Sequence, residues 1–416
     1  MSTEQRPGGR TLIRRLLLFF ALVYVVEGLA QPDGLIAQPL SYYLKTAEGW
    51  TPAQIAAFFS LLYLAWIIKP LYGLISDFVP LFGYRRKSYL VIVNIAAIAG
   101  FVWATQLIAP SALFFALAVT AYAMAISSTL CGAVLVENGQ SLRASGRFVN
   151  QQWLWYNIAA VAAAVAGGQL VQHLLPQDAL HGAAAIAAFT PVVAIAAALL
   201  LVAERKVSMN VQGMKDSFKT LKSSFRRREL WLIAGFLFFY NFSPGLSTPL
   251  YFTMTDTLKF PQSYIGILSS ISALGWIVGA LLYRPFFGDL TLKRLLNLSI
   301  GFGALTTAAF LCLSSETSAA IIYFGAGFAG MIAMVAPLTL AADYCPPGVE
   351  GFTFAVLMSV ANLASTMANN IGALLYTDVF DRHLAPLVVI SAAATAVAFF
   401  GVPLLKLGDK MQGEPR

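Results

Sequence analysis

Apolar stretches of about twenty residues recur along almost the whole chain, and they limit its possible folds more than any other feature. A stretch of this length crosses the hydrocarbon core of a bilayer as one helix. The 416 residues are 58% hydrophobic and 11% charged, whereas soluble proteins carry about 25% charged residues. Because the stretches are continuous rather than alternating, they favour helices over barrel strands. We therefore expect an all-α polytopic membrane protein with about twelve spans, at residues 14–44, 53–77, 87–108, 111–136, 146–173, 182–203, 230–256, 262–284, 293–314, 317–340, 351–377 and 383–406.

The Lys and Arg residues are distributed unevenly over the loops between these spans. With the N-terminus in the cytoplasm, 23 of the 27 fall in cytoplasmic segments, three fall in outer loops and Lys69 lies inside a span. The positive-inside rule therefore predicts a multi-pass protein of the bacterial cytoplasmic (inner) membrane with both termini in the cytoplasm. The net charge of +8 is dispersed over loops and calls for no nucleic-acid partner. The three cysteines show no metal-ligand spacing, and we expect no metal and no cofactor.

The two halves of the chain match each other at a nearly constant offset. An offset of 210 residues aligns Pro39 with Pro249 and Trp66 with Trp276, and an offset of 205 aligns Asn157 with Asn362 and Gly167 with Gly372. We expect an N-terminal six-helix half at residues 1–203, a cytoplasmic linker at 204–229 and a C-terminal six-helix half at 230–416. Two parallel halves of this kind form the major facilitator fold, in which solute binds between the halves near mid-membrane.

The first span carries polar residues on one helical face, namely Glu27, Gln31, Gly34 and Gln38. Glu27 lies near mid-membrane, where desolvation disfavours an ionised carboxylate, so it is our first candidate for proton coupling. The alternative is a neutral or paired structural carboxyl. Asp33 points elsewhere in a regular helix, but a break at Pro32 and Gly34 would turn it inward. Asp33 is therefore the second candidate for proton coupling.

Lys69 is an ionisable residue inside the second span, about two turns before Asp77. Such residues are costly in a bilayer and usually face a cavity or a partner. We expect Lys69 to supply a counter-charge for an anionic solute or for Glu27. The alternative is that its ammonium group snorkels to the interface.

Amide and aromatic side chains in the fifth, seventh and eleventh spans suit a flat heteroaromatic solute, which they can bind by stacking and hydrogen bonding. The alternative for the aromatic residues is helix packing or an interfacial belt. Buried amides need hydrogen-bond partners, which makes the aligned pair Asn157 and Asn362 notable. The candidate substrate-binding residues are Lys69, Gln31, Gln38, Gln152, Trp153, Tyr156, Asn157, Asn241 and Asn362.

Charged residues also cluster at the predicted cytoplasmic ends of spans. A carboxylate there accepts hydrogen bonds at a helix end while an arginine binds an opposing helix, which makes a latch that breaks when that face opens. The alternative is simple anchoring of loops by basic residues. The candidate cytoplasmic gate residues are Asp77, Arg85, Arg86, Glu137, Arg147, Asp289 and Glu350.

The sequence shows no signature of an enzyme. Residues 325–330 match the pattern G-x-G-x-x-G, but they lie within a span and follow no strand, so close helix packing by small residues is the better interpretation. We find no Walker motif, no metal-ligating cluster and no nucleophile–base arrangement. An ATP-driven pump and a membrane hydrolase are both disfavoured.

Two blocks in opposite halves resemble the folate–biopterin transporter family of the major facilitator superfamily. The first runs from Trp66 to Asp77 and continues through Pro80-Leu-Phe-Gly-Tyr-Arg-Arg86. The second begins Cys345-Pro-Pro-Gly-Val-Glu-Gly351 and continues to Asn362. The resemblance covers nearly the whole chain and implies secondary transport of folates or pteridines with protons. Some relatives carry other solutes, including S-adenosylmethionine.

The chain departs from the family pattern at two charged positions. Gly132 stands where the family has an Asp in the fourth span, and Leu154, Trp155 and Tyr156 stand where it has an Arg after Trp153. Losing opposite charges together avoids a stranded charge. The missing Arg weighs against folate itself as the solute, because the two carboxylates of folate favour cationic groups.

The sequence therefore predicts a monomeric, proton-coupled secondary transporter that works by alternating access. Its expected partners are the lipid bilayer, protons and a folate- or pteridine-like or other aromatic, anionic small molecule. Two alternatives stay open. One is a non-transporting facilitator-fold factor for assembly of a pigment–protein complex, and the other is an exporter of a related solute such as S-adenosylmethionine.

Overall fold

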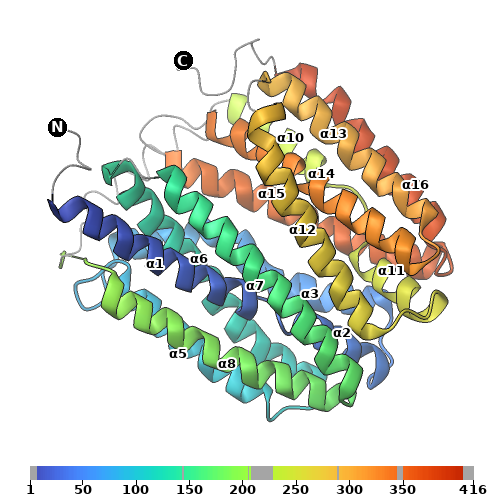
Figure 1. Cartoon of the computed structure of the whole chain (residues 1–416), viewed down its shortest axis with the longest axis horizontal. Helices are drawn as coiled ribbons and strands as arrows, with labels where there is room; N and C mark the ends of the chain where they lie inside the picture. The colour runs from blue at the N-terminus through green and yellow to red at the C-terminus, as the bar shows by residue number, and fades with distance from the viewer. Residues whose placement is uncertain are drawn as a thin grey trace. The chain divides into compact units, whose positions relative to one another are not determined.

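The computed structural model describes residues 7–142, 145–204, 206–207, 228–287, 290–343 and 350–405. Within these ranges the regular secondary structure is helical, apart from isolated bridge residues such as the pair Leu81 and Tyr84. Figure 1 shows these helices, coloured along the chain. Contacts between residues divide the chain into two units. The first unit comprises residues 1–49 and 68–215, and the second comprises residues 50–67 and 216–416.

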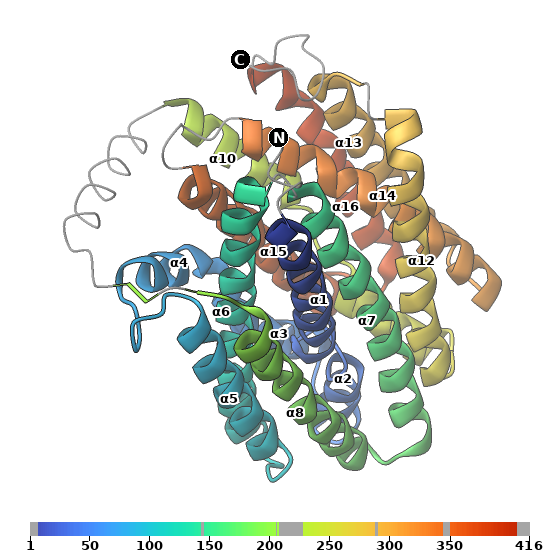
Figure 2. The ribbon, with the colours of Figure 1, turned by 60° about the vertical axis from the view of Figure 1, so that its left-hand side comes forward.

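The first unit is a bundle of apolar helices whose longest members come from the predicted spans. In this unit α1 packs on α7 and α8 (Figure 2), and α5 packs on α6 and α8. The backbone carbonyls at the C-terminal end of α8 accept hydrogen bonds from Arg15 and Lys87, as is common for basic residues at such ends. Its helices are α1 (Pro7–Ala30), α2 (Ala37–Thr46), α4 (Lys69–Phe78), α5 (Lys87–Ala104), α6 (Pro110–Leu142), α7 (Ser145–His173) and α8 (Pro176–Leu201).

The second unit contains the helices that follow the linker and also α3. α3 packs on α15, and α12 and α13 both pack on α14. Two π-helical turns, Thr253–Thr257 and Leu375–Val379, directly follow α11 and α15. The α-helices of this unit are α3 (Pro52–Ile67), α10 (Arg228–Asn241), α11 (Ser247–Phe252), α12 (Gln262–Phe287), α13 (Leu292–Ala309), α14 (Glu316–Asp343), α15 (Glu350–Leu374) and α16 (Leu384–Val397).

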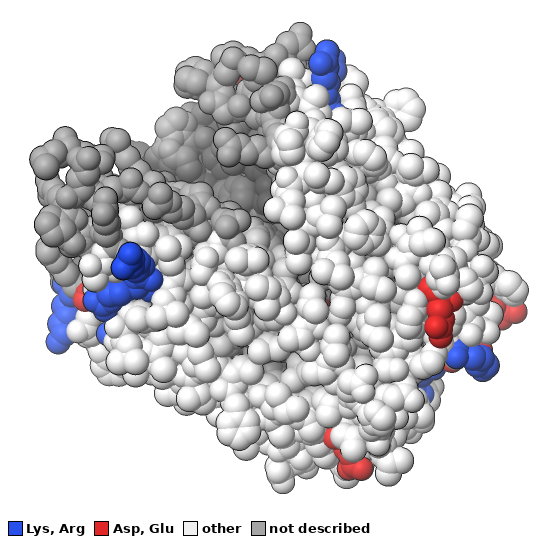
Figure 3. Space-filling view, in the orientation of Figure 1, with Lys and Arg blue, Asp and Glu red and all other residues white. Residues whose placement is uncertain are grey.

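Among the described residues, nine helices are long and apolar enough to cross a membrane. They coincide with the predicted spans two to six, eight to ten and twelve. The predicted first, seventh and eleventh spans are occupied by more polar or interrupted helices, namely α1 with α2, α10 with α11, and α15. On the face shown in Figure 3, most of the described surface is neither basic nor acidic, as expected of a surface that meets lipid. The predicted all-α membrane fold is confirmed.

The two units repeat the same helix pairings. The pairs α1–α7, α5–α6 and α5–α8 of the first unit correspond to α10–α15, α13–α14 and α13–α16 of the second. The contact-based units differ from the predicted halves at residues 50–67, because α3 packs on α15. The boundaries at 1–203, 204–229 and 230–416 stay a prediction.

Two aligned glycines make equivalent close contacts in the two units. A Cβ atom on Gly167 of α7 would lie 3.1 Å from the carbonyl oxygen of Leu35, and one on Gly372 of α15 would lie 2.0 Å from that of Gly245. Leu35 and Gly245 are 210 residues apart, which is the offset found in the sequence. Each contact joins a helix to a break in its neighbour, between α1 and α2 or between α10 and α11. Glycine is needed here because it lets two backbones approach closely.

Candidate proton and solute site

The site in the first unit begins with a break in the polar first span. α1 ends at Ala30 and α2 begins at Ala37, so the break lies where Pro32 and Gly34 predicted one. The backbone N–H of Leu35 donates to the carbonyl of Leu29 at 3.0 Å, across the turn. A Cβ atom on Gly34 would lie 2.5 Å from that same carbonyl oxygen, which explains why glycine stands here. Asp33 in this turn is exposed.

Glu27, one turn before the break, is joined to Lys69 through a serine that sequence analysis missed. The Ser128 hydroxyl on α6 donates a hydrogen bond to Glu27 Oε1 at 2.7 Å. The Ser128 hydroxyl oxygen in turn accepts a hydrogen bond from Lys69 Nζ on α4 at 3.1 Å. All three residues are half-buried. We call these three residues the Glu27–Ser128–Lys69 array. A carboxylate and an ammonium group on separate helices are thus held by one hydroxyl group.

The second contact of the site joins α1 to α7. Gln31 is 7% exposed, and its Nε2 donates to the hydroxyl of Tyr156. The helices approach closely at Gly28, where a Cβ atom would lie 2.8 Å from the carbonyl oxygen of Tyr156. The Tyr156 ring meets the Trp153 ring edge-on, with centroids 5.9 Å apart. Gln38 and Gln152 are half-buried. The first unit thus brings amide and aromatic groups of the predicted solute site onto neighbouring helices.

The three predicted asparagines have different hydrogen-bond acceptors. Asn157 Nδ2 donates to the carbonyl of Trp153 at 2.7 Å, and Asn241 Nδ2 donates to that of Leu237 at 2.8 Å. Both acceptors lie one turn earlier in the same helix. Asn362 Nδ2 instead donates across the second unit to the carbonyl of Trp66 on α3, at 3.4 Å. The repeat-related residues Asn157 and Asn362 therefore make different contacts.

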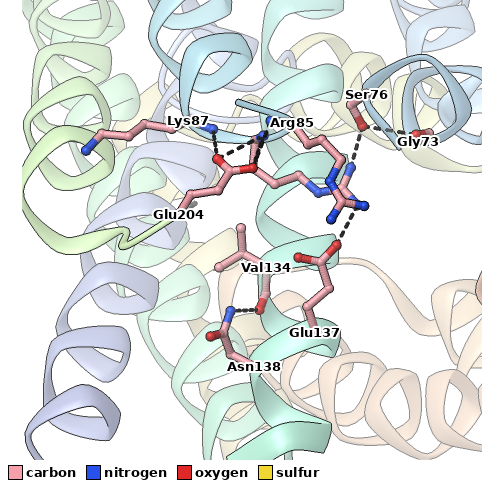
Figure 4. A network of polar contacts seen from close by, with 9 residues as sticks. Gly73, Ser76, Arg85, Lys87, Val134, Glu137, Asn138 and Glu204 are labelled. Atoms are coloured by element: carbon pink, nitrogen blue, oxygen red, sulfur yellow. Dashed lines mark hydrogen bonds and ion pairs between the residues drawn. The ribbon is translucent and has the colours of Figure 1, made fainter. Parts of the chain in front are cut away.

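Several predicted gate residues of the first unit meet in one polar network, shown in Figure 4. Arg86 is 5% exposed. Its Nη2 donates to Glu137 Oε1 on α6 at 2.7 Å, which is an ion pair. Its Nη1 donates to the hydroxyl of Ser76, and that hydroxyl donates to the carbonyl of Gly73 at 3.0 Å. The buried guanidinium thus ties the start of α5 to both α4 and α6. Its charge is compensated, as burial requires.

Glu204, which sequence analysis placed in the linker without a role, caps α5. Its carboxylate accepts backbone hydrogen bonds from Arg85 at 2.8 Å, Arg86 at 3.1 Å and Lys87 at 2.9 Å. A carboxylate at the N-terminal end of a helix satisfies free N–H groups and complements the helix dipole. The backbone N–H of Val207 adds a hydrogen bond to the carbonyl of Gly83. The beginning of the linker is thereby attached to the turn before α5.

The remaining predicted gate residues lie outside the described part of the site. Asp289 lies outside the described residues, and the side chains of Asp77, Arg147 and Glu350 are likewise not described. Among the described residues, the structure brings together Glu27 with Lys69, Gln31 with Tyr156, and Arg86 with Glu137. Ser76, Ser128 and Glu204 complete these contacts.

The arrangement of helices is that of the major facilitator fold. The structure superposes on the D-xylose-proton symporter with a TM-score of 0.71 at 13% identity, covering 95% of this chain and 98% of the other. It superposes on the nucleoside transporter NupG with a TM-score of 0.70 at 15% identity, covering 95% and 99%. At such identities the likeness shows the fold.

The chain belongs to the BT1 family, whose sequence model matches residues 27–395. It is 29% identical to the folate-biopterin transporter of Synechocystis sp., over 94% of this chain and 82% of that protein. It is 24% identical to folate transporter 1 of Plasmodium falciparum, over 85% and 71%. The family resemblance seen in the two sequence blocks is confirmed. These relatives are named as transporters, not as enzymes.

Proposed function

We propose that this BT1-family membrane transporter is a proton-coupled secondary transporter of a folate- or pteridine-like or other aromatic, anionic solute. The names of its relatives support the solute class. The observation that carries the proposal is the Glu27–Ser128–Lys69 array. Ionisable groups within a membrane span are costly, and they mark ion and substrate pathways.

In this proposal Glu27 is the main proton site and Lys69 is the counter-charge for the solute anion. Asp33 is a second carboxyl that could exchange protons, because it is exposed in the turn after α1. The ring and amide groups beside the array supply stacking and hydrogen bonds. The proposed solute contacts are Lys69, Gln31, Gln38, Gln152, Trp153, Tyr156, Asn157, Asn241 and Asn362.

The network around Arg86 is the proposed cytoplasmic latch of the first unit. It contains the ion pair of the buried Arg86 with the exposed Glu137, and a capped helix end. The buried guanidinium and the capped N–H groups must be re-solvated or re-paired if the latch opens. We extend the proposal to the predicted gate residues Asp77, Arg147, Asp289 and Glu350. The proposed location is the bacterial cytoplasmic membrane, with both termini in the cytoplasm and the monomer as the working unit.

Uptake into proteoliposomes tests this proposal. Radiolabelled folate and a pterin are offered with and without an imposed inward proton gradient. We expect the gradient to drive accumulation and a proton ionophore to abolish it. A thermal-shift series with folates, pterins, nucleosides and S-adenosylmethionine identifies the solute, because a ligand of the folded state raises the melting temperature with dose. Uptake that ignores the gradient contradicts proton coupling, and the absence of any ligand-dependent shift contradicts the proposed solute class.

A further inference from the structure

We propose that Ser128 is the positioning residue that couples proton binding to anion binding in the first unit. This inference rests on the proposed function of Glu27 and Lys69. A serine hydroxyl has one proton to donate, and here it donates that proton to Glu27 and accepts a hydrogen bond from Lys69.

The direction of these two hydrogen bonds sets the charge state of the array. With Glu27 ionised and Lys69 protonated, the N–H of Lys69 points to the hydroxyl and the hydroxyl points to the carboxylate. Both bonds are then assisted by a charge, which makes them stronger than bonds between neutral groups. The array has no net charge in this state, and an anionic solute gains little by approaching it.

Protonation of Glu27 changes the net charge of the array. The carboxyl becomes neutral, the array carries the single positive charge of Lys69, and the hydroxyl loses its charged acceptor. An anionic solute can now replace the carboxylate as the counter-charge of the ammonium group. The only chemical change is the gain of one proton by Glu27 from solvent. Proton and anion therefore favour each other's binding, and the coupling is reciprocal.

Other titratable groups also face this array. Tyr24 on α1, Cys131 on α6 and Tyr156 on α7 interact electrostatically with Glu27, as does Asp33 in the turn after α1. The tyrosines and the cysteine belong to types that are ordinarily neutral at neutral pH. Asp33 is a second carboxyl group, so its contribution has to be separated from that of Glu27 by an Asp33→Asn variant.

The structural contrast between Ser128 and its neighbour supplies a matched control. The hydroxyl of Thr129 donates to the carbonyl of Ala125 at 2.8 Å, within its own helix. Thr129→Val removes a hydroxyl from α6 at the adjacent position and leaves the array intact. Ser128→Ala removes the bridging hydroxyl, and Ser128→Thr keeps one.

The test measures the Kd of folate for the purified protein from acidic to mildly alkaline pH. We expect tighter binding at acidic pH in the wild type, in Thr129→Val and in Ser128→Thr. The pH dependence of the Kd that remains in Asp33→Asn is the part that Glu27 supplies. In Ser128→Ala we expect the ratio of the alkaline Kd to the acidic Kd to fall about tenfold. A change of about tenfold corresponds to the free energy of one hydrogen bond to a charged group. A Kd that weakens equally at every pH in Ser128→Ala would overturn the inference, because it would indicate a merely structural role.

A second readout needs no solute. The infrared band of the protonated Glu27 carboxyl, assigned by its loss in Glu27→Gln, gives the pH midpoint of this group directly. We expect Ser128→Ala to move this midpoint by about one pH unit, equivalent to the tenfold change above, and Thr129→Val to leave it in place. An unmoved midpoint overturns the role of Ser128 even if transport proves proton-coupled. A wild type with no titrating Glu27 band overturns the proposed proton site as well.

Discussion

The first unit holds charged side chains among its helices, whereas the second unit keeps its described charges at the surface. Glu27 and Lys69 are half-buried, and Arg86 is buried. In the second unit, every Asp, Glu, Lys and Arg whose side chain is described is exposed. The interior of that unit uses hydroxyl groups, and the hydroxyl of Tyr240, for example, donates to the carbonyl of Ala333 on α14 at 2.9 Å.

A second hydroxyl cluster joins α16 to the break between α10 and α11. Ser243 donates to the carbonyl of Ser391 at 2.8 Å, and Ser391 donates to that of Pro244 at 2.7 Å. Thr395 donates to the Ser243 hydroxyl at 3.1 Å. Such neutral networks rigidify a bundle without titrating near neutral pH. The first unit thus holds ionisable groups between its helices, whereas the described part of the second unit holds neutral hydroxyl networks.

Removal of the ionisable carboxyl of the first unit is expected to have the largest effect. Glu27→Gln keeps the shape of the side chain but cannot bind a proton in the working pH range, so we expect gradient-driven uptake in proteoliposomes to fall to the level of empty liposomes. Ser391→Ala, in the hydroxyl cluster of the second unit, should keep its response to the gradient. If uptake by both variants responds to the gradient alike, the ionisable groups of the first unit have no role in proton coupling that the hydroxyl cluster of the second unit lacks.

A second prediction concerns the charge pairing within the array. Lys69→Met alone strands the Glu27 carboxylate, and breaking one side of a buried charge pair costs about 3 kcal/mol. Lys69→Met combined with Glu27→Gln removes both charges, so we expect the double variant to recover most of the lost stability. Thermal unfolding in detergent at neutral pH measures this. Purely additive losses would show that the two charges do not compensate each other.

A third prediction compares the two glycine contacts. Gly372→Ala places a Cβ atom 2.0 Å from a backbone oxygen, whereas Gly167→Ala places one 3.1 Å from its counterpart. Overpacking costs about 1–3 kcal/mol and occasionally more. We expect Gly372→Ala to lose about 3 kcal/mol or to prevent folding, and Gly167→Ala to lose about 1 kcal/mol. Gly132→Ala is the control variant, because a Cβ atom added at Gly132 would meet nothing within 4 Å. Size-exclusion chromatography and thermal unfolding compare the three variants.

The parts of the fold that sequence could predict are those set by local pattern. Apolar length located the spans, and Pro32 with Gly34 located the break after α1. Ser128 and Glu204 could not be found in this way. Ser128 lies 101 residues from Glu27, and Glu204 lies 117 residues from Lys87. Serines and surface glutamates are also common, so only the tertiary structure selects these two.

The grouping of α3 with the second unit was also beyond local pattern. Residues 50–67 belong to a span that, by sequence order and by the internal repeat, falls in the first half. Their packing on α15 depends on the shapes of two helices far apart in the sequence. Pro70 gives one physical clue to this contact. It stands in the first turn of α4, directly after the end of α3, and a proline has no backbone N–H to donate to the carbonyl four residues before it. That carbonyl belongs to Trp66, which accepts the hydrogen bond from Asn362.

The prediction with the smallest effect compares Asn362, which bonds to the carbonyl of Trp66, with its repeat-related residue Asn157. If Asn362 satisfies the carbonyl of Trp66, Asn362→Leu should cost about 1 kcal/mol of stability. Pro70→Ala restores a backbone N–H for that carbonyl, so Asn362→Leu should cost little in the Pro70→Ala background, and the double-mutant cycle should show a coupling of about 1 kcal/mol. Asn157→Leu should show no coupling to Pro70, because its amide bonds to its own helix. The cycle is measured by thermal unfolding and by solute Kd. A loss of solute affinity that is equal in both backgrounds would instead make Asn362 a direct solute contact.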